Sequence, residues 1–351
     1  MMGVKGVGKE FLIVRLSSIG DVITALPVAD AIKKHIPNSR VSWLVSPPAS
    51  EILKLSKSVD NILLWDRRPF DKAVSSGHFI QTVKLLNEAK KLLSDYEFDV
   101  VLDIHSLFLT GILSKMAKSA LKIGIDELSE GNSFFMTKTV ENIKSPHKGL
   151  RYFNILSAIN INSEAEKPSV AIPKEKLQFA EDLLQSAGIS TDKKIITVNL
   201  KTTWDNKHYP TELFLEVLEK IPQEAQLVFC GNKKDAPFIE SVVKKLNRGV
   251  SIAGKTTITE LAAVFTKATL LLTPDSGPLH IASLVGLKTI SLWGPTEPAM
   301  YAPLFGENTF IVTPHSCSGC NKRSCKYKTN ECMKKISPET ILTAINQMVL
   351  K

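Results

Sequence analysis

Short, apolar, strand-like segments alternate with segments of helical length along this chain, and the alternation runs twice. The first run begins with apolar residues 11–16 and a helical pattern over residues 21–35, and it ends at residue 159. The second run begins with a helical pattern over residues 177–187, followed by strand-like residues 194–200. Strands separated by helices of this length predict parallel sheets that are covered on both faces.

A polar, strand-poor segment separates the two runs. It spans residues 160–173 and contains Pro168 and Pro173, so we interpret it as a linker. A chain of 351 residues is long enough for two domains with separate cores. We therefore expect an α/β chain of two doubly wound, Rossmann-like domains facing a cleft. The expected bounds are residues 1–165, residues 174–336, and a last helix over residues 337–351.

The composition is that of an ordinary globular protein with an excess of positive charge. The formal net charge of +9 predicts an anionic partner, although charge alone does not identify it. Nucleic acid is not expected, because the chain has no basic low-complexity tail and no aromatic RNA-binding signature. No apolar run approaches the roughly 18 residues of a membrane span. Arg15 and Asp21 interrupt the apolar residues near the N-terminus, which argues against a signal peptide, so we expect a cytoplasmic protein.

The first expected strand is followed by Ser17-Ser-Ile-Gly-Asp21. Ligands of doubly wound sheets bind beyond the carboxyl ends of the strands, so these residues are candidates for a site. Asp21, at the start of a helix, either interacts only with the helix dipole or takes a proton from an incoming hydroxyl. Ser17, Ser18 and Gly20 supply hydroxyls and a backbone that a ligand can approach.

A second polar loop, residues 200–210, also joins an expected strand to an expected helix. It places the hydroxyls of Thr202 and Thr203 beside the cationic Lys207, a combination that suits a phosphate. The alternative is a solvated loop whose aromatic side chains only pack.

A third strand-to-helix turn contains Asp275-Ser-Gly277, and a helical pattern resumes at His280. A helix start has several unpaired N–H groups and a dipole equivalent to about +0.5 charge, which together make an anion site. Gly277 lets a phosphate approach the backbone, and His280 adds a donor. The alternative is that Asp275 or Ser276 only caps the helix and that His280 packs in the core.

Two features bear on metal ions. The sequence has no Asp-x-Asp, the paired carboxylates that bind a metal in a large class of sugar transferases, which favours metal-free chemistry. Four of the five cysteines cluster, and such a pattern is also found at zinc and iron–sulfur sites. The alternative, which we favour, is a loop stabilised by partly buried thiols. These cysteines are Cys317, Cys320, Cys325 and Cys332.

Taken together, these motifs resemble glycosyltransferase family 9, the heptosyltransferases that build the inner core of lipopolysaccharide. Leu16-Ser-Ser-Ile-Gly-Asp-Val22 and Asp275-Ser-Gly-Pro-Leu-His280 are similar to its two signatures, and Trp293-Gly-Pro-Thr-Glu-Pro298 follows the second. The match runs through nearly the whole chain in the same order. Thr202-Thr-Trp-Asp-Asn-Lys-His-Tyr-Pro210 and the basic Asp66-Arg-Arg-Pro-Phe-Asp-Lys72 most resemble heptosyltransferase I.

The resemblance implies a GT-B fold with an N-terminal acceptor domain and a C-terminal nucleotide-sugar domain, the final helix crossing back to the first. It implies an inverting, metal-independent transfer of L-glycero-D-manno-heptose from ADP-heptose. The implied acceptor is a hydroxyl of Kdo on lipid A, or of another inner-core sugar. No cofactor is implied, and the enzyme would act at the cytoplasmic face of the inner membrane.

The resemblance also assigns roles to residues. Asp21 becomes the general base, and Lys207 stabilises the charge that develops on the diphosphate. Asp235 lies nearest to the position of the family's ribose-binding glutamate, and Asp275 binds sugar hydroxyls or holds its loop. The donor residues are then Thr202, Thr203, Asp235, Asp275, Ser276, Gly277, Leu279 and His280. The acceptor residues are Ser17, Ser18, Gly20, Arg67, Arg68, Lys72, Lys118 and Arg151.

Three other functions compete with this one. The first is a family 9 transferase for another step, such as addition of the second heptose. The second is a nucleotide-sugar epimerase with the same two-domain architecture. The third is a basic metal-binding module that uses the four cysteines.

Overall fold

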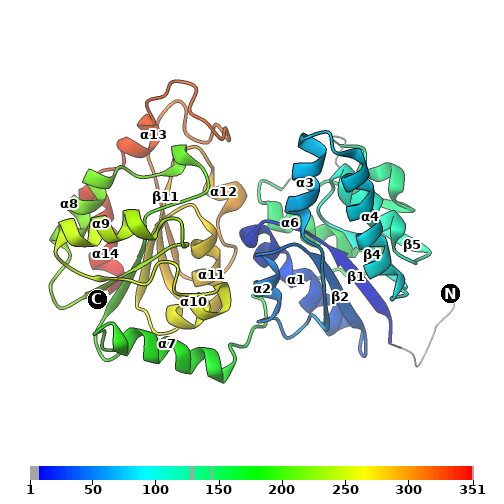
Figure 1. Cartoon of the computed structure of the whole chain (residues 1–351), viewed down its shortest axis with the longest axis horizontal. Coiled ribbons are helices and arrows are strands. Elements are labelled where there is room, and N and C mark those ends of the chain that lie inside the picture. The colour runs from blue at the N-terminus through cyan, green and yellow to red at the C-terminus, as the bar shows by residue number, and fades with distance from the viewer. Residues whose placement is uncertain (1–7, 127–129, 144, 350–351) are drawn as a thin grey trace. The chain divides into compact units, whose positions relative to one another are not determined.

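A computed structural model describes residues 8–126, 130–143 and 145–349 of the chain. Its contacts divide the chain into two compact units, Met1–Ala171 and Ile172–Lys351, called here the N-terminal and C-terminal units (Figure 1). The boundary falls within residues 160–173, the segment interpreted as a linker.

The N-terminal unit is built on a six-stranded parallel sheet of order β3-β2-β1-β4-β5-β6. The order of the strands reverses between β1 and β4, so the segments that follow these two strands leave towards opposite faces. A crevice is therefore expected at the carboxyl ends of β1 and β4, where ligands of such sheets bind. The strands are β1 (Glu10–Val14), β2 (Arg40–Val45), β3 (Asn61–Leu64), β4 (Val100–Asp103), β5 (Leu121–Asp126) and β6 (Lys138–Glu141).

Helices cover both faces of this sheet. Leu12 and Val14 of β1 pack with Ala89 of α4 and Leu113 of α5 on one face. On the other side of the unit α1 packs against α6. The helices are α1 (Ile19–His35), α2 (Ser50–Leu53), α3 (Arg67–Ser75), α4 (Phe79–Ser94), α5 (Phe108–Met116) and α6 (Lys148–Phe153), with 3-10 turns η1 (Asn132–Phe135) and η2 (Asn154–Ile159).

The C-terminal unit repeats the same plan, with strand order β12-β11-β10-β7-β8-β9, all parallel. Its reversal falls between β7 and β10, so a second crevice is expected at their carboxyl ends. The strands are β7 (Ile195–Asn199), β8 (Gln226–Cys230), β9 (Val250–Ser251), β10 (Leu270–Pro274), β11 (Lys288–Trp293) and β12 (Asn308–Val312).

The core of this unit lies between the sheet and α8, α9 and α14, where Val198, Phe214, Ile239 and Ile345 are buried together. Helix α10 packs against both α7 and α11 in the same unit (Figure 1). The helices are α7 (Lys174–Ser186), α8 (Thr211–Lys220), α9 (Ala236–Leu246), α10 (Ile258–Phe265), α11 (Gly277–Val285), α12 (Pro298–Tyr301), α13 (Glu331–Lys334) and α14 (Pro338–Val349), with the 3-10 turn η3 (Asp205–Lys207).

The two doubly wound α/β halves predicted from the sequence are confirmed, but the expected path of the last helix was wrong. Helix α14 packs against α8 and belongs to the C-terminal unit rather than crossing back. The physical reason is its apolar stripe, since Ile341 and Ile345 are buried in the core of that unit. Residues 350 and 351, the end of the expected helix, lie outside the described residues.

Within the part of the chain that the structure describes, no helix is both long enough and apolar enough to cross a membrane.

Candidate functional site

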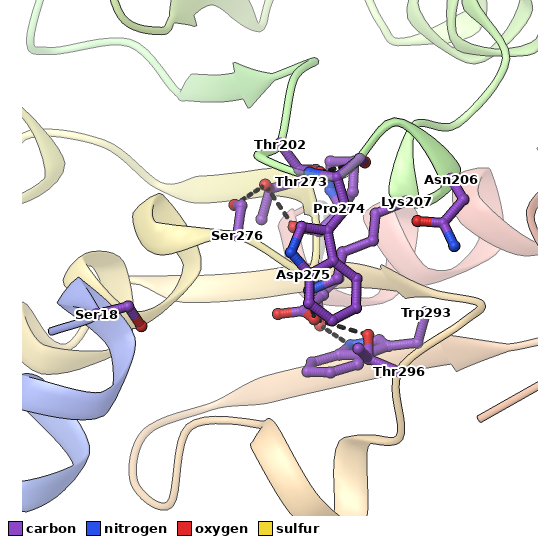
Figure 2. Close-up of polar contacts among 12 residues, drawn as sticks. Ser18, Thr202, Asn206, Lys207, Thr273, Pro274, Asp275, Ser276, Trp293 and Thr296 are labelled. Atoms are coloured by element: carbon purple, nitrogen blue, oxygen red, sulfur yellow. Dashed lines mark hydrogen bonds and ion pairs between the residues drawn. The ribbon is translucent and has the colours of Figure 1, made fainter. Parts of the chain in front are cut away.

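Two loops meet at the carboxyl ends of β7 and β10 in the C-terminal unit. Asn199, the last residue of β7, is almost fully buried and joins them. Its amide donates to Thr273 Oγ1 (2.9 Å), to Ser276 Oγ (3.1 Å) and to the carbonyl of Lys201 (2.9 Å). The hydroxyls of Thr273 and Ser276 are 2.8 Å apart (Figure 2). The Asn199 amide thus fixes the loop after β7 relative to the start of α11.

Asp275 joins three loops through one carboxylate oxygen. Its Oδ2 accepts from Lys207 Nζ at 2.6 Å and from the hydroxyl of Thr296, which follows β11, at 2.7 Å (Figure 2). The side chains of Asp275 and Lys207 are only 9% and 13% exposed, so water screens this ion pair poorly. The ammonium also lies 4.3 Å from the centre of the Trp204 ring, an attractive cation–π contact. The Asp275 carboxylate and the Trp204 ring therefore fix the position of the Lys207 charge from two sides.

Helix α11 begins beside this ion pair. Ser276 is its N-cap, and Ser276 and Gly277 are half-buried, so a ligand can reach their backbone. Helix geometry leaves the first N–H groups without partners inside the helix, and Pro278 has no N–H to offer. Leu279 and His280 have buried side chains, and they anchor this turn in the unit. The result is an anion-binding helix start next to a fixed ammonium.

The remaining predicted donor residues lie at the same sheet edge. The Thr202 hydroxyl donates to the carbonyl of Trp204 (2.9 Å) and accepts from its N–H (3.1 Å), so it shapes the loop, whereas Thr203 is exposed. Asp235 is the N-cap of α9, after the neighbouring strand β8. Lys201, which the sequence did not single out, places its ammonium 4.0 Å from the centre of the Phe238 ring on α9.

The cysteine-rich segment, residues 317–332, is hydrogen-bonded to the loop after β11 that leads to Thr296. Gly319 N–H donates to the carbonyl of Gly294 (2.9 Å), and Asn321 N–H donates to that of Pro295 (2.7 Å), directly before Thr296. All five cysteines are free thiols. Burial and then the neighbouring thiols raise the pKa of Cys332 to about 11, and those neighbours are Cys317, Cys320 and Cys325. Among the described residues, no three His, Cys, Asp or Glu side chains are arranged to hold a metal ion.

In the N-terminal unit, Asp21 lies in the first turn of α1, which follows β1 at the reversal of strand order. Its Oδ1 lies 2.9 Å from the Arg15 guanidinium and accepts from the Tyr152 hydroxyl at 2.9 Å. Its Oδ2 accepts from the hydroxyl (2.9 Å) and the N–H (3.2 Å) of Ser18. These four donors match the roughly four lone-pair positions of a carboxylate. The side chain is nevertheless 27% exposed, so a ligand can reach it.

The charge of this carboxylate is fixed by its surroundings. Burial alone would raise the pKa of Asp21, but the Arg15 guanidinium, the Ser18 hydrogen bonds and the nearby Lys148 together hold that pKa well below its usual range. Arg15 is itself buried, donates to the carbonyl of Ile104 (3.1 Å) and lies 4.6 Å from the centre of the Tyr152 ring. Asp21 is therefore ionised at neutral pH.

His105 comes just after β4, so it lies at the same reversal of strand order as Asp21, which follows β1. Its Nδ1 accepts the N–H of Leu16 at 3.2 Å, so the ring proton is on Nε2. Burial, with the Arg15 charge as the next cause, lowers the pKa of His105 well below its usual value. The ring is a neutral donor at pH 7, half-buried beside the Arg15–Asp21 pair. The sequence analysis missed it together with Arg15 and Tyr152.

The predicted acceptor arginines begin α3, at the carboxyl end of β3. Arg67 pairs with Asp71 (2.9 Å), and Arg68 pairs with Asp66 (2.6 Å). Exposed ion pairs of this kind contribute little, so an incoming phosphate can replace the carboxylates. Lys72, in the last turns of α3, is exposed.

The other predicted acceptor residues divide into two groups. Ser17 precedes Ser18, the N-cap of α1, and Gly20 lies in the first turn of that helix. Arg151 lies on α6, and its Nε donates to the carbonyl of Ser145 (2.8 Å). The assignment of Lys118 was wrong. It precedes β5 and donates to the carbonyl of Ser94 (2.8 Å), so it lies at the amino ends of the strands, the edge opposite to Asp21.

Comparison with known proteins adds independent information. The model of the family described as "Glycosyltransferase family 9 (heptosyltransferase)" matches residues 87–330. The lipopolysaccharide core heptosyltransferase OpsX of Haemophilus influenzae is 28% identical over 301 residues, which are 84% of this chain and 82% of that protein. Lipopolysaccharide heptosyltransferase 1 of Campylobacter coli is 26% identical over 97% of this chain and 98% of that protein.

The fold also has a counterpart among solved structures. The structure of the E. coli heptosyltransferase WaaC with ADP-2-deoxy-2-fluoro heptose matches 96% of this chain and 99% of its own, with a TM-score of 0.73 and 18% identity. This likeness confirms the GT-B fold that the sequence predicts.

Proposed function

The chain belongs to glycosyltransferase family 9, a family of transferases, and we propose that it transfers L-glycero-D-manno-heptose from ADP-heptose to lipopolysaccharide. The acceptor is a hydroxyl of Kdo or of another inner-core sugar. The relatives named above carry lipopolysaccharide heptosyltransferase in their names, and the WaaC structure contains an ADP-heptose analogue. Family membership sets aside the epimerase and the metal-binding module as the chain's main function.

One observation carries the proposal: the start of α11 and the fixed Lys207 ammonium lie together at the switch point of the C-terminal unit. Backbone N–H groups of Ser276, Gly277 and Leu279 would bind the diphosphate, and Lys207 would supply the positive charge. Lys207 has three N–H donors and Asp275 uses one, so two remain for phosphate oxygens. Thr202, Thr203 and Asp235 line the loops around the nucleotide, and His280 holds the helix start.

Asp21 is the general base in this proposal. The acceptor oxygen attacks the anomeric carbon, its proton passes to Asp21, and the bond from that carbon to the phosphate oxygen breaks on the opposite face. ADP leaves with the bonding electrons, and the configuration at the anomeric carbon inverts. All four lone-pair positions of Asp21 are already occupied, so the acceptor hydroxyl must replace one of the present neutral donors. Ser18 is exposed, so its hydroxyl is the donor that the acceptor replaces most readily.

Charge on the departing diphosphate is neutralised by protein groups. Lys207 and the α11 start stabilise it where it develops, which is the largest contribution to many such reactions. Because these groups supply the positive charge, the transfer does not require a metal ion or a cofactor.

The acceptor is anionic, and the N-terminal unit offers matching charges. Arg67, Arg68 and Lys72 would bind its phosphates and carboxylates, with Arg151 and the Ser17–Gly20 turn nearer to Asp21. Such an acceptor is anchored in a bilayer by lipid A, so the enzyme works in the cytoplasm at the inner membrane.

A transfer assay followed by mass spectrometry tests the proposal. The purified chain is incubated with ADP-heptose and a panel of acceptors that end in Kdo, in one heptose or in a further core sugar. We expect one heptose to be added to the Kdo-ended acceptor. Addition only to the heptose-ended acceptor would instead assign the second heptose step.

A further inference from the structure

Apolar side chains are exposed together where α3 ends and α4 begins. Phe79 and Ile80 are 77% and 86% exposed, and Val74 and Val83 are 54% and 40% exposed. We call residues 72–84 the α3–α4 tip. Large apolar groups exposed side by side, rather than singly, mark interaction surfaces.

The tip projects beyond the sheet of the N-terminal unit. The indole N–H of Trp65, just after β3, donates to the carbonyl of Leu85 at 3.1 Å, so Leu85 lies level with the carboxyl end of that strand. The far end of α4 lies at the amino ends of the strands, because Ser94 accepts from Lys118. The six residues from Phe79 to Lys84, which precede Leu85, therefore carry the helix about 9 Å past the sheet. Helices α3 and α4 pack side by side there (Figure 1).

Within the α3–α4 tip itself, the formal charges have one sign. From residue 72 to residue 84 the sequence contains no Asp or Glu, whereas Lys72 and Lys84 are exposed at its two ends. Lysine stems lie along apolar surfaces while their ammonium groups reach polar ones. Aromatic and aliphatic side chains flanked by lysine are the pattern of segments that lie in the interface of an anionic bilayer.

A second copy of the chain fits this surface less well. A stable protein interface needs about 20–30 residues a side, far more than the four apolar side chains of the tip. A symmetric pair of tips would also bring lysines towards lysines. An anionic bilayer satisfies both the apolar groups and the ammonium groups.

We propose that the α3–α4 tip inserts Phe79 and Ile80 into an anionic membrane and so holds the N-terminal unit at the surface where its acceptor is anchored. The inference rests on the proposed function for the identity of that membrane. The same helix α3 carries Arg67 and Arg68 at its other end, so membrane contact and acceptor binding share one element.

Flotation with vesicles tests the proposal without any transfer reaction. The full chain is mixed with vesicles of phosphatidylethanolamine and phosphatidylglycerol, or of phosphatidylcholine alone. The double variant Phe79→Ser/Ile80→Ser should lower partitioning into the anionic vesicles by about tenfold for each side chain. Lys84→Glu should lower it about fivefold or more, because each lysine near such a surface contributes about that factor.

Matched control variants test whether a loss of vesicle binding is specific to the α3–α4 tip. Lys91→Glu makes the same charge change at the far, exposed end of α4 and should leave partitioning within about twofold of wild type. Tyr327→Ser removes a 62% exposed aromatic from the other unit and should leave it unchanged. Circular dichroism checks that each variant is folded.

The outcomes are distinct. Anionic-vesicle binding that depends on Phe79, Ile80 and Lys84 supports the inference even if no heptose transfer is found, which would overturn the proposed function alone. Wild-type binding by the Phe79→Ser/Ile80→Ser variant, or no vesicle binding by the wild type, overturns the inference. Loss of a dimer in gel filtration on this substitution would also overturn it, by identifying the partner as a second copy. With an acceptor that lacks acyl chains, the variant should retain wild-type turnover.

Discussion

Asp21 is the residue whose chemistry depends most on its neighbours. An efficient general base has a pKa near the working pH, and the neighbours of Asp21 hold its pKa far lower. The carboxylate is therefore always available but weakly basic. On this account its contribution comes from its fixed orientation, which Arg15, Tyr152 and Ser18 impose through both oxygens.

Replacing Asp21 by Asn is the first test at this scale. Asp21→Asn keeps the shape of the side chain but removes the proton acceptor, so kcat should fall by about 10²–10⁴-fold. ADP affinity, measured by calorimetry, should stay near wild type because the nucleotide binds the other unit. Asp30→Asn, the same change on the same helix where Asp30 bonds Ser58 and Ser169, is the control. Equal turnover by Asp21→Asn and wild type would exclude Asp21 as the base.

The pH–rate profile tests the low pKa of Asp21 and the contribution of the hydrogen bond that the Tyr152 hydroxyl donates to it. A carboxyl whose pKa is lowered by folding stays ionised as the pH falls, so wild-type kcat/KM should have no acid limb from Asp21 above pH ~5. Tyr152→Phe removes one donor to the buried carboxylate, which raises its pKa and should move the acid limb to higher pH. In the wild type, the lowered pKa of Asp21 also stabilises the fold at pH values above about 4. This contribution to stability is lost as the pH falls through the low pKa of the folded state. Superimposable profiles would contradict the role of Tyr152.

The variant Lys207→Ala tests the proposed diphosphate site in the C-terminal unit. Removing a charge-assisted hydrogen bond to the diphosphate should weaken ADP binding by about tenfold to a hundredfold and lower kcat as well. Among the described residues, the loss leaves the Asp275 carboxylate with Thr296 as its one side-chain partner, so its uncompensated charge adds repulsion toward phosphate. Lys220→Ala, on the surface of α8 where Lys220 pairs with Glu216, is the control. If Lys207→Ala changed only the melting temperature, the loop would be structural.

The sequence singled out residues in three strand-to-helix segments, but it missed Arg15 and His105, which also follow strands, and Tyr152, which lies on α6. Asp21, Lys207 and Asp275 lie in the segments that connect strongly apolar strands to the next helix, so topology alone places them at the carboxyl edge. Tyr152 meets Asp21 across 131 positions, and no local pattern carries that information. Arg15 and Asn199 could have been found, because each lies at the end of a strand at a reversal of strand order. Lys118 could have been rejected, because it comes before its strand.

At the scale of elements, hydrophobic patterning predicted the buried strands and failed for the polar or exposed elements. Helix α3 was missed because its sequence has little apolar face and contains Pro69. It is held instead by the Asp66 cap and the Arg67–Asp71 pair. Strand β12 was missed because it is an edge strand in which only Ile311 is buried and two of the five residues are exposed. The path of α14 was inferred from the family resemblance, but the apolar side chains of this helix are buried in the core of the C-terminal unit.

Helix α14 gives the prediction at this scale. Ile345 is buried in the core of the C-terminal unit, so Ile345→Ala should lower the free energy of unfolding by about 2–5 kcal/mol in urea denaturation. Gln347→Ala, at an exposed position of the same helix, should change it by no more than about 0.5 kcal/mol. Equal stabilities of the two variants would show that α14 does not contribute to this core.

At the scale of the whole molecule, the two units repeat one architecture and carry different chemistry at the same topological place. The reversal between β1 and β4 holds a fixed carboxylate, and the reversal between β7 and β10 holds a fixed ammonium beside a helix start. A transferase needs both, a base for the acceptor and a positive site for the departing diphosphate. Neither unit contains both sets of groups in the part of the chain that the structure describes.

The most direct test of this account is the mass-spectrometric transfer assay with ADP-heptose, carried out with and without EDTA. The account predicts that a Kdo-ended acceptor gains one heptose, that ADP is released in equal amount, and that EDTA changes neither. An acceptor panel in which no member gains a heptose, while the folded protein still binds ADP, would contradict it.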